Sequence, residues 1–144
     1  MSKTIIVGGF GPGIATSVAE KFGSQGFAVA LVGRNAERLA AGVTALEAKG
    51  IKAAPLQADL GSPVAVKALG GQVRQKLGPI GVLHWNAYSA SAGDVLSADV
   101  PGLQNVFDVA VTGLVTAVQE SLADLKQAKG AVLVTNGGLL FDDA

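Results

Sequence analysis

The chain has 144 residues and a mass of 14.3 kDa, which suffices for one domain with a buried core but not for a cofactor domain plus a separate substrate domain. Its 11 basic and 11 acidic residues cancel and neither sign forms a long run, so the electrostatic footprint of a duplex nucleic-acid binder is missing. The absence of cysteine excludes a disulfide framework, a zinc–thiolate site and a cysteine nucleophile.

The first apolar stretch, residues 4–7, ends at Gly8 and is too short for the hydrophobic region of a signal peptide or for a membrane span. A lack of cysteine also agrees with a reducing compartment. We therefore expect a soluble cytoplasmic protein with neither nucleic acid nor a membrane as a partner.

The hydrophobic pattern alternates between short apolar runs and longer segments of helical period, which is typical of βαβ units. Continuous apolar runs predict parallel strands that are covered on both faces. These runs are residues 4–7, 27–32, 52–56, 82–85 and 131–135. The predicted fold class is therefore α/β.

Crossover helices are predicted between these strands. The first begins near Gly13 and places Ile14, Val18 and Phe22 on one face. The next two begin at N-cap residues and end at glycines: Asn35 to Gly50, and Ser62 to Gly78.

The longest predicted helix spans residues 103–126, about six turns. Its broad apolar face predicts burial against the sheet and against a partner subunit. The residues of this face are Leu103, Val106, Phe107, Ala110, Val111, Leu114, Val118, Leu122 and Leu125.

A glycine-rich loop, residues 8–15, joins the first strand to the first helix. Glycine lets the backbone approach a pyrophosphate, while the free N–H groups and the positive dipole end of a helix attract it. The spacing G-x-G-x-x-G fails because its third position is Ile14, whereas Gly9-x-x-x-Gly13-x-Ala15 fits. A P-loop is excluded because no Lys-Ser or Lys-Thr follows, and a turn without a ligand is the alternative. The residues predicted to contact phosphate are Gly9, Phe10, Gly11, Pro12, Gly13 and Ile14.

The second strand ends in Gly33-Arg34-Asn35, where a fold that prefers NAD would carry an acidic residue for the ribose 2′-hydroxyl. Arg34 could instead pair with a 2′-phosphate through its planar guanidinium, which favours NADP, with NAD as the alternative cofactor. A solvated arginine beside a helix cap is the other interpretation.

In their order along the chain, these elements and motifs resemble the short-chain dehydrogenase/reductase family over essentially the whole sequence. Besides the glycine loop and Gly33-Arg34, the resemblance rests on Asp59-Leu60 and on residues 80–88, which replace an Asn-Asn-Ala-Gly turn. It implies a Rossmann-like doubly wound parallel sheet with strand order 3-2-1-4-5, of which later strands are missing here, and an NAD(P) groove at the carboxyl ends of the strands. The groove residues that it implies beyond the loop are Gly33, Arg34, Asn35, Asp59, Leu60, Asn86 and Ala87. Asp59 could instead only cap the next turn, and Asn86 could only tie backbone segments together.

The family's Ser-Tyr-Lys trio and helix asparagine are not matched. The asparagine position is Ala110, and the paired serines match Asn136 and Gly137. The only tyrosine, Tyr88, is followed four residues later by Ala92 rather than lysine. The family's chemistry needs a tyrosine phenol whose pKa is tuned toward neutral pH. No catalytic residue is therefore assigned in this chain.

Two further features are interpreted as structural. His84, alone inside an apolar strand, is expected to be a core residue without a catalytic role. Asp142-Asp143 is expected to be a solvated terminus, because no histidine or third carboxylate lies nearby to complete a metal site.

The favoured function is an NADP-preferring oxidoreductase that transfers hydride between NADP(H) and a carbonyl or alcohol substrate. The family's tyrosine and lysine would follow Ala144, so we expect residues 1–144 to be the N-terminal part of a longer domain of more than 14.3 kDa. The alternatives are a non-catalytic NAD(P)-binding or regulatory module and, more weakly, a domain for another nucleotide. The resemblance also implies a homodimer or homotetramer formed through the 103–126 helix.

Overall fold

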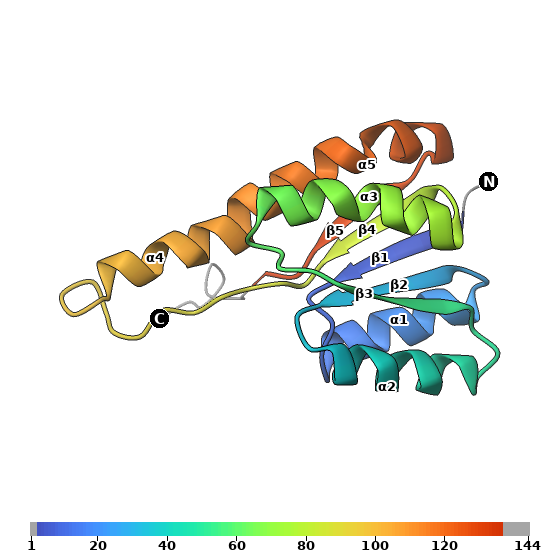
Figure 1. The fold of residues 1–144 in the computed structure, drawn as a ribbon, viewed down its shortest axis with the longest axis horizontal. Helices are drawn as coiled ribbons and strands as arrows, with labels where there is room; N and C mark the ends of the chain where they lie inside the picture. Colours follow the sequence, from blue (N-terminus) through green and yellow to red (C-terminus); the bar gives the residue numbers. More distant parts are fainter. Residues whose placement is uncertain (1–2, 137–144) are drawn as a thin grey trace, which may run out of the picture.

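The computed structural model of the chain describes residues 3–136. Five strands form one sheet in the order β3-β2-β1-β4-β5, and every neighbouring pair is parallel. This arrangement (Figure 1) confirms the predicted Rossmann-like α/β fold and its strand order. The strands are β1 (Thr4–Gly8), β2 (Ala28–Gly33), β3 (Ala53–Gln57), β4 (Ile80–Trp85) and β5 (Ala131–Val134).

Helices cover both faces of the sheet, with α1 and α2 on one side and α3 and α5 on the other (Figure 1). Alternate strand residues supply the two cores: Ile5 and Val7 pack toward α1 and α2, whereas Ile6 and Leu83 pack toward α3 and α5. The helical elements are α1 (Ile14–Ser24), α2 (Ala36–Glu47), α3 (Pro63–Leu77), α4 (Val100–Phe107), the π-helical η1 (Asp108–Gly113) and α5 (Leu114–Ala128).

The helix starts differ in how they are capped. The side chain of Asn35 accepts a hydrogen bond from Arg38 N at 2.9 Å, and Ser62 accepts one from Ala65 N at 3.3 Å, as their positions before α2 and α3 predict. Gly13, before α1, offers no side-chain cap. The amino end of α1 is therefore left with donors for another partner.

The core-facing side of α1 agrees with the prediction in part. Val18 and Phe22 are partly buried and pack against the core, as predicted, whereas Ile14 is 55% exposed. The fully buried positions of α1 are the small residues Ala15, Ala19 and Gly23. A Cβ on Gly23 would lie 2.5 Å from Cγ2 of Ile51, before β3, so this position cannot hold a larger residue.

The long helix also packs through small residues. Elements α4, η1 and α5 form one continuous helix whose buried positions include Gly113, Ala117 and Ser121. A Cβ on Gly113 would lie only 2.0 Å from the carbonyl oxygen of Leu60. Glycine at this position therefore lets the long helix lie against the backbone of the loop after β3. Several residues of the predicted core face are instead exposed: Phe107, Ala110, Val111 and Leu122.

The same helix, Val100–Ala128, is long and apolar enough to cross a membrane by length and composition, with a mean hydropathy of 1.3. One such helix is weak evidence for a membrane span. Its small buried residues pack on the sheet here, so in this fold it serves as a covering helix.

A charged network joins α3, β4 and α5. Asp124 Oδ2 accepts hydrogen bonds from Arg74 Nε at 2.8 Å and from the backbone N of Ile80 at 2.9 Å. Arg74 Nη2 also donates to the carbonyl oxygen of Glu120 at 2.6 Å. These bonds connect two covering helices to the first residue of a central strand.

Candidate functional site

A cavity of about 810 Å³ lies at the carboxyl ends of the strands, within the usual size range of ligand pockets. The loops after β1, β2, β3 and β4 line it together with the long helix. This is the place where an open parallel sheet binds ligands, because the strand order reverses between β1 and β4. Its lining residues are Gly9, Phe10, Gly11, Pro12, Gly33, Arg34, Asn35, Arg38, Ala58, Asp59, Leu60, Asn86, Ala87, Tyr88, Ser89, Asn105 and Val109.

The structure brings together all of the residues predicted for the groove except Gly13 and Ile14, which do not line the cavity. Gly13 is exposed and adopts a φ of 92°, a conformation that favours glycine. Its contribution is therefore to turn the chain into α1. Ile14 then begins that helix with its side chain exposed.

The glycine loop is held by its neighbours on both sides. The backbone N–H groups of Gly9 and Phe10 both donate to the carbonyl oxygen of Val32, at 3.0 and 2.8 Å. Gly9 adopts a φ of 81°, and a Cβ there would lie 2.5 Å from the backbone N and Cα of Ala87. Gly9 thus needs to be glycine for both conformation and space.

Asn86 ties this loop to the end of β4. Its backbone N donates to the carbonyl oxygen of Gly8 at 2.8 Å, and its side-chain Nδ2 donates to that of Gly9 at 3.4 Å. The interpretation that Asn86 connects backbone segments therefore holds, alongside its place in the cavity wall.

The amino end of α1 supplies the free donors of the loop. The first backbone bond inside the helix runs from Ser17 N to Gly13 O, so the N–H groups of residues 14–16 precede the helical pattern. Thr16 uses its hydroxyl to donate to Gly11 O at 2.9 Å, which fixes the turn. Uncapped N–H groups and the positive dipole end suit a phosphate.

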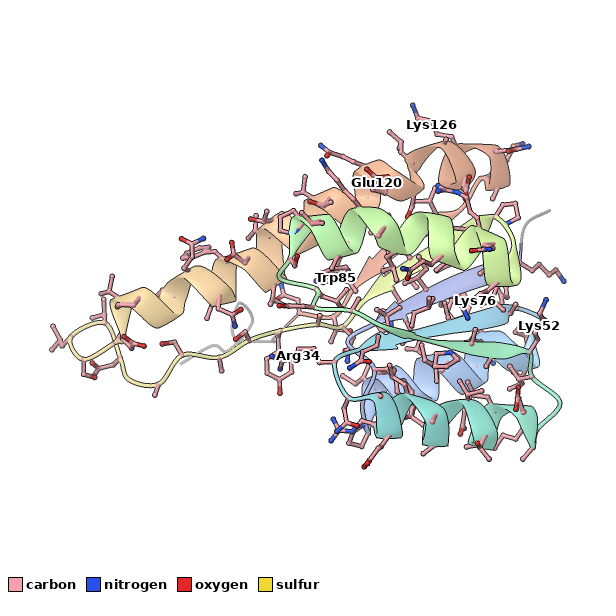
Figure 2. The ribbon with its side chains drawn as sticks, viewed as in Figure 1. Arg34, Lys52, Lys76, Trp85, Glu120 and Lys126 are labelled. Carbon is pink, nitrogen blue, oxygen red and sulfur yellow. The ribbon has the colours of Figure 1, made fainter. Side chains whose placement is uncertain are left out.

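Two arginines stand at the end of β2 and the start of α2. Arg34 is exposed and lines the cavity, and its position at the carboxyl ends of the strands is visible in Figure 2. Arg38, which was not predicted, also lines the cavity, and its Nη1 lies 3.9 Å from where a Cβ on Gly11 would be. Within residues 3–136 neither guanidinium forms an ion pair. Both positive charges are therefore available to an anion.

Asp59 forms one polar wall of the cavity. Its Oδ1 accepts a hydrogen bond from Gly61 N at 2.9 Å, which is the local turn that the alternative interpretation expected. A carboxylate has further acceptor capacity beyond that single bond. Asp59 is also exposed, so it can both shape its loop and accept a hydrogen bond from a ligand.

An adjoining wall comes from the long helix. Asn105 Nδ2 donates to Ser89 Oγ at 2.7 Å, which links α4 to the loop after β4. Its Oδ1 lies 3.5 Å from where a Cβ on Gly61 would be, so Asn105 also reaches the loop after β3. The amide thus spans two loops of the cavity.

Sequence reasoning missed six lining residues. Arg38 carried a usable signal, because it lies four residues after Arg34 on the first turn of α2. Tyr88 and Ser89 follow the predicted Asn86-Ala87 directly. The residues without a local signal come from α4, η1 and the start of the loop after β3: Asn105, Val109 and Ala58.

His84 is a core residue, as predicted. It is 3% exposed, and its Nε2 lies 2.9 Å from Oγ1 of Thr135, the residue after β5, while its Nδ1 has no hydrogen-bond partner. An unpaired acceptor nitrogen is tolerated better than an unpaired N–H, so the neutral ring with the proton on Nε2 fits best. Burial lowers the pKa of His84 below its ordinary value.

Of the family's catalytic positions, the two within the described residues do not line the cavity. Ala110 is exposed and does not line it, and Asn136 is exposed after β5. Gly137, Asp142 and Asp143 lie outside the described residues. In residues 3–136 no group of three or more His, Cys, Asp or Glu side chains could hold a metal ion.

Comparison with known proteins adds independent findings. The profile of the short chain dehydrogenase family matches residues 3–138. The meso-2,3-butanediol dehydrogenase of Serratia marcescens is 29% identical over 134 residues, which are 93% of this chain and 53% of that protein.

Two solved structures share the fold. A short-chain dehydrogenase from Sphingobium yanoikuyae in complex with NADPH has a TM-score of 0.84 and 27% identity, covering 96% of this chain and 55% of that one. An NADPH-bound short chain oxidoreductase from Pseudomonas aeruginosa PAO1, described as containing an atypical catalytic center, has a TM-score of 0.88 and 22% identity, covering 99% and 56%. This chain therefore spans about half the length of these relatives.

Proposed function

The chain belongs to the short-chain dehydrogenase/reductase family, and on this premise we propose that it binds NADP(H) and forms the nucleotide-binding part of an oxidoreductase that interconverts a carbonyl compound and an alcohol. The observation that carries the proposal is one cavity lined by the glycine loop, two arginines and Asp59. A dinucleotide has two phosphates, a base and hydroxyls, and these groups match the donors and acceptors present.

The residues present fit such a group. The pyrophosphate would lie against the loop from Gly9 to the amino end of α1, where the N–H groups are free. The lack of a side chain at Gly9 lets the loop lie against the backbone of Ala87. Adenosine would lie between Arg34 and Asp59-Leu60, with the nicotinamide ribose near Asn86-Ala87.

The preference for NADP rests on Arg34 and Arg38. Both guanidinium groups line the cavity without an ion pair to a described carboxylate, so a 2′-phosphate would gain charge-assisted hydrogen bonds. The NADPH complexes of the Sphingobium and Pseudomonas proteins support this choice by analogy.

NADPH and NADH titrations followed by nucleotide fluorescence test the cofactor assignment. We expect NADPH to bind more tightly than NADH. We expect Arg34→Glu to reverse this preference, because a carboxylate would repel the 2′-phosphate. Loss of the arginine–phosphate contact alone costs roughly tenfold or more in affinity. Lys21→Glu makes the same charge change outside the cavity and should leave the preference unchanged. Equal affinities for both cofactors before and after Arg34→Glu would refute the role of Arg34.

A bound nicotinamide dinucleotide supplies the hydride, and the chain must supply proton transfer and substrate orientation. Ala110, at the family's asparagine position, has no amide, and Gly137, at its serine position, has no hydroxyl, so neither can do so in the family's usual way. A non-catalytic NAD(P)-binding or regulatory module is therefore the second candidate, favoured by Ala110 and Gly137. A Tyr-x-x-x-Lys segment after Ala144 would support the enzyme, whereas a chain without it would leave only binding.

We also propose that residues 1–144 are the N-terminal part of a longer single domain. All four residues of β5 are exposed, although three of them are large and apolar. An apolar strand at an open sheet edge is an aggregation hazard that proteins normally cover. An intact mass above 14.3 kDa supports the proposal, and an intact mass equal to it contradicts it.

The substrate would be a small carbonyl or alcohol compound, and the protein would act in the cytoplasm as a homodimer or homotetramer. The exposed apolar residues of the long helix support assembly: Phe107, Val111, Val115 and Leu122. Their spacing places them along one stripe of the helix surface.

A further inference from the structure

Trp85, the only tryptophan of the chain, lies behind the cavity wall, between the end of β1 and the long helix. It ends β4, is 1% exposed, and sits in the layer between the sheet and the α3 and α5 helices (Figure 2). It does not line the cavity itself, so any effect on a ligand must pass through its neighbours.

The indole ring fills the space that two glycines leave open. A Cβ on Gly8, where the glycine loop begins, would lie 3.3 Å from its Cε3. A Cβ on Gly113, in η1, would lie 3.1 Å from its Cζ2. The ring therefore spans the gap between the phosphate loop and the long helix at van der Waals contact.

The indole also forms a directed bond to the helix. Its Nε1 donates to the carbonyl oxygen of Val109 at 3.1 Å, inside the π-helical turn. π-Helical turns are rare and interrupt the regular hydrogen-bonding pattern of a helix. A hydrogen-bond donor from another element can therefore determine at which residues such a turn forms. Val109 is a cavity wall residue, and Asn105 lies one turn before it on the same wall.

The loop after β3 packs against the same two glycines. A Cβ on Gly113 would lie 2.0 Å from the carbonyl oxygen of Leu60, and a Cβ on Gly8 would lie 3.5 Å from Leu60 Cδ1. Leu60 and Trp85 also belong to one core cluster. We therefore expect a change at the indole to disturb the packing of this loop and of the long helix.

On these contacts, and resting on the proposed dinucleotide site, we propose that Trp85 is a positioning residue for the adenosine half of the dinucleotide. Its ring sets the distance between the glycine loop and the long helix. Its N–H holds Val109 and Asn105 in the helical register that places them beside Asp59-Leu60 in the cavity wall.

The test is Trp85→Phe in the full chain, with adenosine 2′,5′-bisphosphate as the probe and calorimetry as the measurement. This variant keeps an aromatic ring but loses the N–H donor, and we expect binding about three- to tenfold weaker. Because the chain has one tryptophan, global replacement of tryptophan by benzothienylalanine changes only this site and removes only the N–H. This second variant should show the same loss and keeps the test valid if Trp85→Phe does not fold.

Val73→Ala is the matched control, because Val73 is 0% exposed in the same core cluster but does not line the cavity. It should lower the melting temperature and leave the affinity for the probe unchanged. Wild-type affinity in the tryptophan variants, or an equal loss in Val73→Ala, overturns the proposal. Failure of the unaltered protein to bind either the probe or NADPH contradicts the proposed function instead.

Discussion

At the scale of single residues, two glycines of the loop after β1 meet different requirements. Gly9 combines a φ of 81° with close contact to the backbone of Ala87. Gly13 adopts a φ of 92°, but a Cβ there would have nothing within 4 Å. A side chain at Gly9 therefore meets both strain and a clash, whereas one at Gly13 meets strain alone.

Gly9→Ala should lower the free energy of unfolding by about 2 kcal/mol or more and weaken NADPH binding, because it combines a positive φ with a backbone clash. The matched control is Gly71→Ala in α3, where a Cβ meets nothing within 4 Å. It should be neutral or stabilise the protein by up to about 1 kcal/mol. Urea unfolding and nucleotide titration measure both, and a Gly9→Ala variant that matches the wild type would contradict the role of this contact.

His84 predicts a pH dependence of stability. Its pKa in the folded protein is lowered by burial, so the unfolded chain binds more protons between that pKa and the ordinary value of 6.5. The His84 contribution is therefore complete above pH 6.5 and is lost as the pH falls below it, by at most about 1.4 kcal/mol per pH unit.

The measurement is the free energy of unfolding between pH 7.5 and 5, compared with His84→Gln, which keeps a polar side chain but cannot titrate. The wild type should lose more stability than the variant over this range. Parallel curves for the two proteins would show that His84 does not titrate differently in the folded state.

The cavity wall shows what sequence could not predict at this scale. Arg34 directly follows β2 and Asp59 lies two residues after β3, so their position at the carboxyl ends follows from the strand pattern alone. Asn105 and Val109 reach the cavity only because the long helix approaches Leu60 closely and contains a π-helical turn. Both conditions depend on tertiary contacts of Gly113 and Trp85, which no local pattern reveals.

At the scale of elements, strand order and helix starts could be predicted, whereas the buried sides of two helices could be predicted only in part. Apolar periodicity identifies Val18 and Val118, which do pack on the core. It misses the small residues at which α1 and α5 are most deeply buried, which include Ala19, Gly23 and Ala117. Close packing on a sheet excludes large side chains, so the stripe with the highest hydrophobicity need not be the buried one. The distance between each helix and the sheet therefore determines which residues of the helix are fully buried.

The network around Asp124 gives a prediction at this scale. Asp124→Ala should lower the free energy of unfolding by about 2 kcal/mol, because it leaves the N–H of Ile80 and the guanidinium of Arg74 without their acceptor. The control is Lys49→Ala, which breaks the exposed pair with Glu20 and should change stability by less than about 0.5 kcal/mol. Equal effects in chemical unfolding would show that the network does not connect α3, β4 and α5 energetically.

At the scale of the whole molecule, two exposed apolar regions stand apart from the nucleotide cavity. One is β5, whose open edge supports the proposed continuation of the domain. The other is the stripe of the long helix that carries Phe107, Val111, Val115 and Leu122. Such contiguous apolar surface on a folded protein usually marks an interface.

The stripe predicts how a single charge should affect assembly. Most homo-oligomers are built on two-fold axes, so a helix that packs on its own copy presents each substitution twice. Val111→Glu would bring two carboxylates into one apolar contact, where burial and mutual repulsion both disfavour association. We expect the wild type to scatter light as a dimer or tetramer and Val111→Glu to shift toward the monomer.

Val64→Glu is the control for this change, because Val64 is 80% exposed on the first turn of α3 and lies off the stripe. A carboxylate at the start of a helix is also favourable, so the variant should fold and assemble like the wild type. A wild type that scatters as a monomer, or a Val111→Glu variant that assembles as fully as Val64→Glu, would place the interface elsewhere. All lining residues of the cavity come from one chain, so we expect a monomeric Val111→Glu variant to keep its affinity for NADPH. Such binding would show that the cavity is complete within one chain.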